Sequence, residues 1–293
     1  MGLKIIKKIC TAPVKYIPSV FYPVYASRLG RQIKKKFNLS RGIFCLSFDN
    51  DYRADNVAAE LLLPELANRN IPVTWAVIGK WVEEFKDFHL KAISAGHELM
   101  NHSWSHPDSP ELRPEDARKF DSLSDLEVFE EINKNHDFCF EHLNYKMKGF
   151  RFPHFRFHPA AKEILKKLGY EYTSNEFSMD SSEWGVPYKN EILEIPLAGI
   201  PRRPGRTVES YRLFRNPDGL YKNEDQFFLD FESLLHATEK YGLVTCIYLD
   251  AIDMAQLKRP HFNEYLDTLC RHDIDVLTYG EVARRLNDGA FER

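Results

Sequence analysis

The chain has 293 residues, of which 43% are hydrophobic and 13% aromatic, enough to bury the core of one large α/β domain over residues 41–293. Its five cysteines are odd in number and scattered, with no C-x-x-C pair. This pattern argues against a disulfide framework or a thiolate zinc site and predicts reduced thiols in the cytoplasm. The net charge of −3 is small, but the charged residues are unevenly distributed along the chain.

Residues 1–40 form a basic, partly apolar N-terminal arm. Residues 1–41 carry ten basic side chains and no aspartate or glutamate. Lysines interleaved with apolar and aromatic residues suit an anionic membrane surface better than a nucleic acid, so we expect the arm to lie on the inner face of the membrane. Pro13, Pro18 and Pro23 interrupt its apolar stretch, which is too short to span a bilayer and lacks a secretory cleavage site. The alternatives are an arm that packs on the acidic surface of the domain, and a transit peptide.

Beyond the arm, short apolar runs alternate with amphipathic segments, a pattern that predicts a mostly parallel sheet surrounded by helices. The predicted strands are Ile43–Asp49, Val73–Ile78, His97–His102, Gly149–Phe152, Tyr170–Ser174, Ile192–Leu197, Leu243–Asp250 and Val276–Thr278. The predicted helices are 54–69, 81–95, 123–142, 159–168, 225–241, 261–271 and 280–287. A strand and helix unit therefore repeats seven or eight times.

Polar residues with the chemistry of a metal site stand at the ends of these strands. Four of them lie at or just beyond a C-terminal strand end: Asp49, His102, Arg151 and Asp250. In a parallel barrel those ends converge on the face where barrel enzymes build their sites. Asp51 and His106 add a carboxylate and a second imidazole, which together with His102 are the ligands of an open catalytic metal site. Each residue alone would be read as a cap or a surface group, so the prediction depends on their order along the chain.

These residues resemble motifs of the polysaccharide deacetylases of carbohydrate esterase family 4, over roughly residues 41–287. The segment S-F-D-N-D resembles the first motif, which makes Asp49 the general base and Asp51 a metal ligand. His102 and His106 match the second motif, H-[ST]-x-x-H, which supplies two further ligands. The resemblance implies a distorted barrel of seven or eight βα units that holds one divalent metal ion. Zinc is favoured for this ligand set, and cobalt, manganese or iron would fit it.

The third and fourth motifs of the family are also present. Arg151 and Pro153 begin the motif R-x-P-[YF], in which the arginine pairs with the base carboxylate and keeps it ionised. We assign Pro153 to the substrate pocket. His154 replaces the final aromatic residue, and its backbone N–H is a candidate donor to the oxyanion. The motif D-x-x-[DE]-W runs from Asp180 to Trp184. The resemblance implies that Trp184 forms part of a pocket for the acyl methyl and that Asp180 supports the general acid.

The fifth motif departs from the family. Where family members end a late strand with the histidine that protonates the departing amine, this chain has Asp250, preceded by Leu249, which we assign to the substrate pocket. If Asp180 faces Asp250, two close carboxyls would share a proton, and one of them could serve as the acid. His154 and His158 are alternative donors, and loss of activity is the remaining alternative.

Together these features predict a metal-dependent hydrolase that removes an acetyl or formyl group from the nitrogen of an amino sugar, in a cell-surface glycan or a lipid-linked precursor. Segment 199–224 is loop-like and offers candidates for binding phosphate or sugar groups. They are Arg202, Arg203, Arg206, Arg212, Arg215, Tyr211, Phe214 and Tyr221. The alternatives are a catalytically impaired glycan-binding barrel, a hydrolase of small amides, and a metal-free interaction protein. No nucleic-acid partner is expected.

Overall fold

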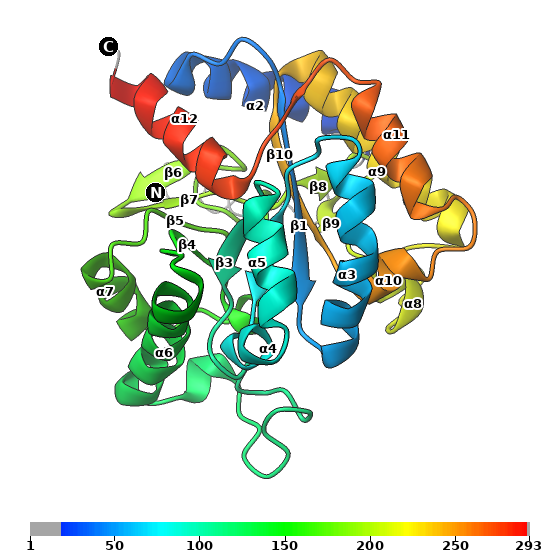
Figure 1. The fold of residues 1–293 in the computed structure, drawn as a ribbon. Coiled ribbons are helices and arrows are strands. Elements are labelled where there is room, and N and C mark those ends of the chain that lie inside the picture. Colours follow the sequence, from blue (N-terminus) through cyan, green and yellow to red (C-terminus); the bar gives the residue numbers. More distant parts are fainter. Residues whose placement is uncertain (1–18, 292–293) are drawn as a thin grey trace.

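The computed structural model describes residues 19–291, and Figure 1 shows their arrangement. A main sheet of nine strands curls into a half barrel, with the strand order β10-β1-β2-β3-β4-β5-β7-β6 and with β11 paired to β1. Its strands are β1 (Ile43–Asn50), β2 (Thr74–Val77), β3 (Glu98–Asn101), β4 (Gly149–Phe150), β5 (Tyr172–Thr173), β6 (Tyr188–Asn190), β7 (Ile192–Glu194), β10 (Val244–Leu249) and β11 (Asp275–Val276). All neighbours are parallel except β6 and β7.

Helices surround the curled sheet (Figure 1). They are α2 (Tyr22–Phe37), α3 (Arg53–Ala67), α4 (Gly79–Glu84), α5 (Lys86–Ser94), α6 (Asp125–Leu143), α7 (Pro159–Lys167), α8 (Tyr211–Phe214), α9 (Glu224–Tyr241), α10 (Ala251–Ala255), α11 (Phe262–Cys270) and α12 (Tyr279–Phe291). Short 3-10 turns are η2 (Ser19–Phe21), η3 (Phe120–Ser122) and η4 (Pro153–Phe155), and β8 (Gly199–Ile200) pairs with β9 (Arg203–Thr207) in a separate hairpin.

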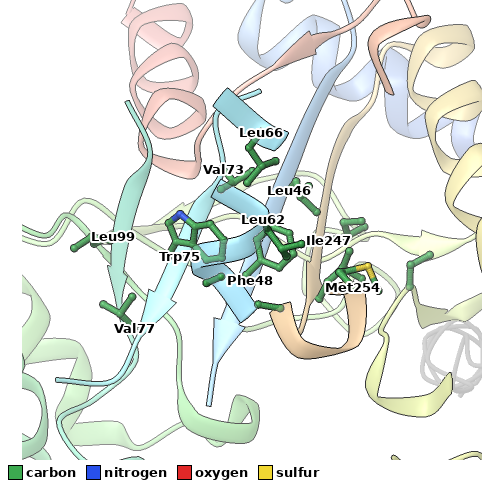
Figure 2. Packing of buried hydrophobic residues seen from close by; sticks show 14 of the residues in the cluster. Leu46, Phe48, Leu62, Leu66, Val73, Trp75, Val77, Leu99, Ile247 and Met254 are labelled. Carbon is green, nitrogen blue, oxygen red and sulfur yellow. The ribbon is translucent and has the colours of Figure 1, made fainter. Parts of the chain in front are cut away.

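Side chains of β1 alternate between the two faces of the sheet, and all eight of its residues are buried. Phe44 and Phe48 join the core between the sheet and the helices, where the Phe48 ring stacks on Trp75 with centroids 4.7 Å apart (Figure 2). Full burial of each such side chain contributes roughly 1.5–3 kcal/mol. Cys45 belongs to a second core cluster, on the inner face. Because the alternation continues along the strand, Asp49 also points to the inside of the barrel.

Part of the N-terminal arm is a helix of this fold. Along α2, one face is buried and packs against α9 and α12, near the beginnings of β1 and β10. The buried residues of the helix are Tyr22, Ala26, Leu29, Gly30, Ile33 and Phe37. A Cβ at Gly30 would lie 1.9 Å from the carbonyl oxygen of Tyr241, so only glycine permits this approach. This part of the arm therefore packs on the domain, but through apolar contacts and not through the acidic surface that the alternative named.

The rest of the arm, residues 1–18, lies outside the described residues, and so does Cys10. Pro23, which the sequence prediction treated as an interruption, stands in the first turn of α2, where proline is tolerated. Between residues 19 and 291, no helix combines the length and hydropathy that crossing a bilayer requires.

The predicted α/β barrel is confirmed, and each predicted strand overlaps a strand of the structure. Three differences concern the connections. The predicted helix 81–95 is two helices, α4 and α5, because the backbone leaves the helical region at Phe85 (φ −107°, ψ 38°). Segment 199–224 contains the β8–β9 hairpin and α8 and is more than a loop. The prediction also missed α10, a short helix directly after β10.

Candidate active site

The carboxyl ends of four strands carry most of the predicted site residues. The chain reaches Asp51 directly after β1 and His102 directly after β3, while Arg151 follows β4 and Asp250 follows β10. Strands β1, β2, β3 and β4 are parallel neighbours. Parallel strands end at a common edge, so the topology brings these side chains together.

Three of the side chains form a compact triad. The Nε2 atom of His102 lies 3.3 Å from Oδ1 of Asp51, and Nε2 of His106 lies 3.7 Å from the same oxygen. All three candidate ligand atoms lie within 4.8 Å of one another. Both histidines are buried, and the Asp51 side chain is 19% exposed. The structure thus brings together the three residues that the sequence predicts as metal ligands.

The chemistry of the triad fits a divalent cation. Oδ1 of Asp51 and Nε2 of His106 are buried and have no hydrogen-bond partner among the described residues, which is costly unless something else binds them. Nδ1 of His102 lies 2.8 Å from the carbonyl oxygen of Arg151, to which it donates, so its Nε2 keeps a lone pair that faces Asp51. Burial alone raises the pKa of Asp51, but His106 and His102 together hold it well below its usual range.

Buried hydrogen bonds fix the turn that holds the two histidines. Ser103 and His106 adopt left-handed backbone conformations, with φ of 72° and 46°. The hydroxyl of Ser103 accepts the N–H of His106 at 3.0 Å, and the side chain of Asn101 accepts the N–H of Ser103 at 2.8 Å. Glu131 of α6 accepts two further N–H groups of the turn. Strained backbone held in this way is common at ligand-binding sites.

Asp108 links His106 to His154. Its Oδ1 lies 3.0 Å from Nδ1 of His106, and its Oδ2 lies 3.4 Å from Nε2 of His154. The ligand atoms of these three residues are also close enough to hold a metal ion. However, a neutral imidazole has only one nitrogen lone pair, and Nε2 of His106 already faces Asp51. We therefore assign Asp108 to orienting His106.

Arg151 holds the predicted base. It is fully buried, and its guanidinium donates to the carboxylate of Asp49, to the Ser47 hydroxyl at 3.0 Å and to the Tyr279 hydroxyl at 3.1 Å. The Tyr248 ring lies 5.6 Å from the guanidinium carbon. Burial lowers the pKa of Arg151, but the charge of Asp49, its hydrogen bond to the guanidinium and the nearby Tyr279 and Tyr248 together raise it above its usual value. Arg151 therefore holds the carboxylate of Asp49 in place through a buried ion pair.

The strand register places Asp250 beside Asp49. Phe48 pairs with Leu249 in the β1–β10 ladder, so the next residues, Asp49 and Asp250, are adjacent and point to the same face. Ser210 contacts Asp250 twice, because its hydroxyl accepts the Asp250 N–H at 3.0 Å and lies 3.4 Å from Oδ2. Asp250, at the position where the resemblance implies a histidine, is therefore held beside the predicted base.

Asp250 belongs to a buried ionic cluster with a single cation. The guanidinium of Arg215 pairs with Asp250 and, at 3.0 Å, with the fully buried Asp253. Burial and the charge of Asp55 raise the pKa of Asp250 well above its usual range, against the opposing effect of Arg215. Burial and the charge of Asp51 raise the pKa of Asp55 to about 7. One guanidinium among three buried carboxyls favours retention of a proton near neutrality.

The fourth motif is not brought into contact with this cluster. Asp180 is exposed, and within residues 19–291 its side chain makes no hydrogen bond or ion pair with Asp250. Trp184 is 42% exposed, and its carbonyl oxygen accepts a hydrogen bond from Tyr25 of α2 at 3.0 Å. The idea that Asp180 and Asp250 share a proton is therefore replaced by the pairing of Asp250 with Arg215.

Two residues assigned to the substrate pocket are buried. Leu249 is 1% exposed and lies in the core between the sheet and the helices, because its side chain points away from the barrel interior. The inner position one residue earlier belongs to Tyr248, whose hydroxyl donates to Glu209 at 2.6 Å. Pro153 is buried at the start of η4, directly before His154. Strand alternation thus corrects the assignment of Leu249.

His158 has a structural role. Its Nδ1 accepts the N–H of Ala160 at 3.2 Å and so caps α7, and its Nε2 lies 3.0 Å from the carbonyl oxygen of Leu123. Both ring nitrogens are occupied within the fold. The structure therefore removes His158 as a proton donor and leaves His154 as the exposed imidazole beside the triad.

Most of the arginines predicted to grip a substrate are used inside the protein. Arg202 pairs with Asp230, Arg206 and Arg212 pair with Asp218, and Arg215 is in the ionic cluster. Of the nearby aromatic residues, only Tyr211 is exposed, at 39%. Arg203 is exposed and is the one of the five without an ion pair within residues 19–291. A phosphate grip formed by several free guanidinium groups is therefore not supported.

Three residues of the site were missed by the sequence analysis. Asp108 stands two residues after His106, and its position in H-x-x-x-H-P-D was the available signal. Tyr248 could have been found by counting two residues back from Asp250 along the alternating strand. Asp55 follows Asp51 by one helical turn at the start of α3, but its contact with the N–H of Ile252 at 3.1 Å spans 197 positions and has no local signal.

Comparison with known proteins identifies related sequences. Residues 37–173 match the family model described as polysaccharide deacetylase. An uncharacterized 30.6 kDa protein of Geobacillus stearothermophilus is 32% identical over 81 residues, which is 27% of this chain and 30% of that protein. The uncharacterized protein YlxY of Bacillus subtilis is 25% identical over 134 residues, or 45% of this chain and 37% of that protein. The chain thus spans about a third of the length of these relatives.

Solved structures share the fold. A probable polysaccharide deacetylase from Pseudomonas aeruginosa PAO1 aligns with a TM-score of 0.66 and 13% identity over 85% of this chain and 92% of that one. The peptidoglycan deacetylase PdaC from Bacillus subtilis aligns with a TM-score of 0.51 and 16% identity over 85% and 93%. A pseudoenzyme of the same family from Bacillus anthracis aligns with a TM-score of 0.54 and 15% identity over 83% and 66%. At these identities the similarity establishes the architecture alone.

Proposed function

We propose that this chain, which belongs to the polysaccharide deacetylase family, is a metal-dependent hydrolase that removes an acetyl or formyl group from the nitrogen of an amino sugar. One observation carries the proposal: Asp51, His102 and His106 converge within 4.8 Å beside a carboxylate, Asp49, that is paired with the buried Arg151. An amide carbonyl is a poor electrophile and water is a poor nucleophile. A cation held by the three ligands would polarise the carbonyl, and Asp49 would take the proton of the attacking water.

The metal ligands, Asp49 and the backbone N–H of His154 have distinct roles in the proposed reaction. A divalent cation held by Asp51, His102 and His106, with zinc favoured, would supply Lewis acidity and lower the pKa of water. Asp49, held in an ion pair with Arg151, accepts the proton of the attacking water. The N–H of His154 points out of a left-handed turn at φ 49° and has no acceptor in the described part of the chain, so it can donate to the oxyanion.

We assign the proton donor to Asp250. When the acyl C–N bond breaks, the departing nitrogen must take up a proton, and Asp250 is the neighbour of Asp49 in the strand register. Its raised pKa supports a protonated state, and Ser210 and Arg215 hold it in place. His154 is the second candidate, because it is exposed beside the triad.

The basic arm remains a proposal for membrane attachment. On the outer face of α2 and its preceding turn, Val20, Phe21 and Val24 are exposed beside basic residues, with no acidic residue in the helix. Such a surface suits anionic lipid headgroups. Replacing Phe21 and Val24 by serine should weaken binding to anionic vesicles without changing activity on a soluble substrate. Equal binding of parent and variant would refute the attachment.

The proposed function is tested by hydrolysis of acylated amino sugars. The protein, purified without chelators, should release acetate or formate from at least one N-acylated amino sugar, and His102→Ala should lower this rate by about three orders of magnitude or more. His142→Ala is the matched control, because His142 is an exposed histidine of α6. A metal-loaded parent without acyl release from any acylated amino sugar or glycan would contradict the proposal.

A further inference from the structure

A cavity between α2 and the end of α9 lies far from the candidate active site. It has a volume of about 390 Å³, and its walls come from α2, from residues 39–42, from residues 239–242 and from Asp273. Figure 1 shows α2 at the end of the molecule where β1 begins, whereas the candidate active site lies at the carboxyl ends of the strands. The residues assigned to catalysis do not line the cavity. It is therefore separate from the proposed reaction.

The lining of the cavity carries an excess of positive charge. Its basic residues are Arg31, Lys34, Arg41 and Lys240, and its acidic residues are Glu239 and Asp273. Both acidic residues are used inside the protein, because Asp273 pairs with Arg41 and Glu239 lies 2.8 Å from Nδ1 of His272. Arg31, Lys34 and Lys240 are exposed, and among residues 19–291 they have no acidic partner. Three like charges around one cavity repel one another, and a bound anion would relieve this repulsion.

One side of the cavity also offers backbone donors. Four consecutive residues, 39–42, form this side and connect α2 to β1. None of their N–H groups has an acceptor in the described part of the chain, although the next one, that of Ile43, donates to the carbonyl oxygen of Leu243 at 2.8 Å. Free N–H groups next to lysine and arginine side chains are typical donors to phosphate oxygens. The cavity thus combines positive charge with hydrogen-bond donors.

The exposed apolar end of α2 lies on the same side of the helix as the cavity. Ser27, Arg31 and Lys34 line the cavity from this helix, and Val24 precedes Ser27 by about one helical turn and Arg31 by about two. Val24 is 69% exposed, and Phe21 is 57% exposed. At 1.5 Å per residue, Val24 and Lys34 are about 15 Å apart along the helix axis. One membrane surface can therefore contact the apolar end of α2 and the cavity together.

We infer that this cavity binds the phosphate group of an anionic membrane lipid and prefers a phosphate monoester to a diester. Its four basic and two acidic side chains leave an excess of two positive charges. A monoester carries about −1.5 to −2 charges near neutral pH and has three acceptor oxygens, whereas a diester carries a single charge. The inference rests on the membrane attachment proposed above and deepens it, because attachment by charge alone requires no particular headgroup.

Vesicle binding by the full chain tests this inference. The two kinds of vesicle contain either phosphatidic acid, a monoester, or phosphatidylglycerol, a diester, in amounts that give the same surface potential. We expect the parent to bind the phosphatidic acid vesicles at least about five-fold more tightly, because a monoester accepts additional charge-assisted hydrogen bonds. The double variant Lys34→Gln, Lys240→Gln should lose this preference.

The double variant Arg28→Gln, Lys35→Gln is the matched control. Both residues are exposed on α2 and neither lines the cavity, so the control loses the same charge and should keep the preference for phosphatidic acid. All three proteins contain residues 1–18, so any contribution of that segment to binding is common to them. Equal binding of the two kinds of vesicle by the parent, or equal loss of preference in the two double variants, would overturn the inference and leave attachment by general charge in place.

Inorganic phosphate distinguishes a lipid headgroup from a free phosphate. At a concentration equal to that of the accessible phosphatidic acid, it should not release the parent from the vesicles, because it lacks the lipid surface that Phe21 and Val24 contact. Complete release would overturn the assignment to a lipid. Acyl release from a soluble amino sugar should be the same in the parent and in both double variants. Failure of the proposed reaction would therefore leave the vesicle result unaffected.

Discussion

The two sides of the candidate site are built differently. On the metal side, Asp51, His102 and His106 lie within a few residues of the strand ends that position them, in turns fixed by nearby hydrogen bonds. On the acid side, Asp250 depends on Arg215, which comes from a separate segment 35 residues earlier. The metal side matches what the sequence motifs imply, whereas the acid side has different partners from those expected.

This difference shows what short motifs can specify. A motif at the end of a strand fixes both the residue and its direction, because the strand sets which side chains face inward. A partner that arrives from another segment is fixed by tertiary packing, which leaves no local pattern. Asp250, at the position where the resemblance implies a histidine, therefore has neighbours that no single motif contains: Arg215, Asp253 and Asp55.

The largest expected effect is on kcat, and it tests whether Asp49 acts as the base without being a metal ligand. Asp49→Asn should lower kcat by about 10³-fold, because the variant cannot accept the proton of the attacking water, yet it should keep its bound metal. Metal content and acyl release measured on one preparation check this. Loss of metal together with activity would mean that Asp49 is a ligand and that the two sides are not independent.

A second prediction concerns the acid side. Asp250→Asn should reduce kcat by about 100-fold on an amide substrate, and by much less on an aryl ester, whose leaving group needs no proton. His154→Gln should have the smaller effect on the amide. The opposite ranking of the two variants would move the proton donor to His154.

The next smaller effect, on kcat/KM, is expected for Trp184 of the fourth motif. Trp184→Ala should change kcat/KM by less than about two-fold, because among residues 19–291 Trp184 bonds to α2 through its carbonyl oxygen and makes no hydrogen bond or ring contact with the triad. Tyr25→Phe, which removes the hydrogen bond to that carbonyl, serves as the comparison. A loss of ten-fold or more in Trp184→Ala would show that its side chain reaches the substrate.

The smallest expected effect is on stability. It distinguishes His97, at one end of β3, from the candidate ligand His102 at the other end. Burial lowers the pKa of His97 from 6.5 to about 4, and its Nδ1 accepts the N–H of Val73 at 3.1 Å. The unfolded chain binds a proton below pH 6.5 while the folded chain does not, so the free energy of unfolding falls as the pH drops from 6.5 to about 4.

His97→Asn keeps an acceptor for Val73 and removes this titration. Between pH 6.5 and about 4, the free energy of unfolding of the parent should therefore fall by up to about 3 kcal/mol more than that of the variant. Urea unfolding at several pH values provides the measurement. Parallel stability profiles of the two proteins would contradict a buried, neutral His97.

The fold was more predictable than the connections. Alternating runs such as Ile43–Asp49 are buried on both faces and stand out from their surroundings, and the structure has strands at each of them. The sequence predicts a surface arm where the structure has α2, because the partners of its apolar stripe, α9 and α12, begin at residues 224 and 279. The break at Phe85 and the pairing of Arg215 depend in the same way on packing between distant segments.

The most direct test of this account is the metal content of the purified protein. We predict one divalent ion per chain after chelator-free purification and zinc loading, reduced to near zero in His102→Ala and Asp51→Ala and unchanged in Asp250→Asn. Absence of metal from the loaded parent, or equal metal in the parent and the triad variants, would contradict the claim that Asp51, His102 and His106 form a metal site.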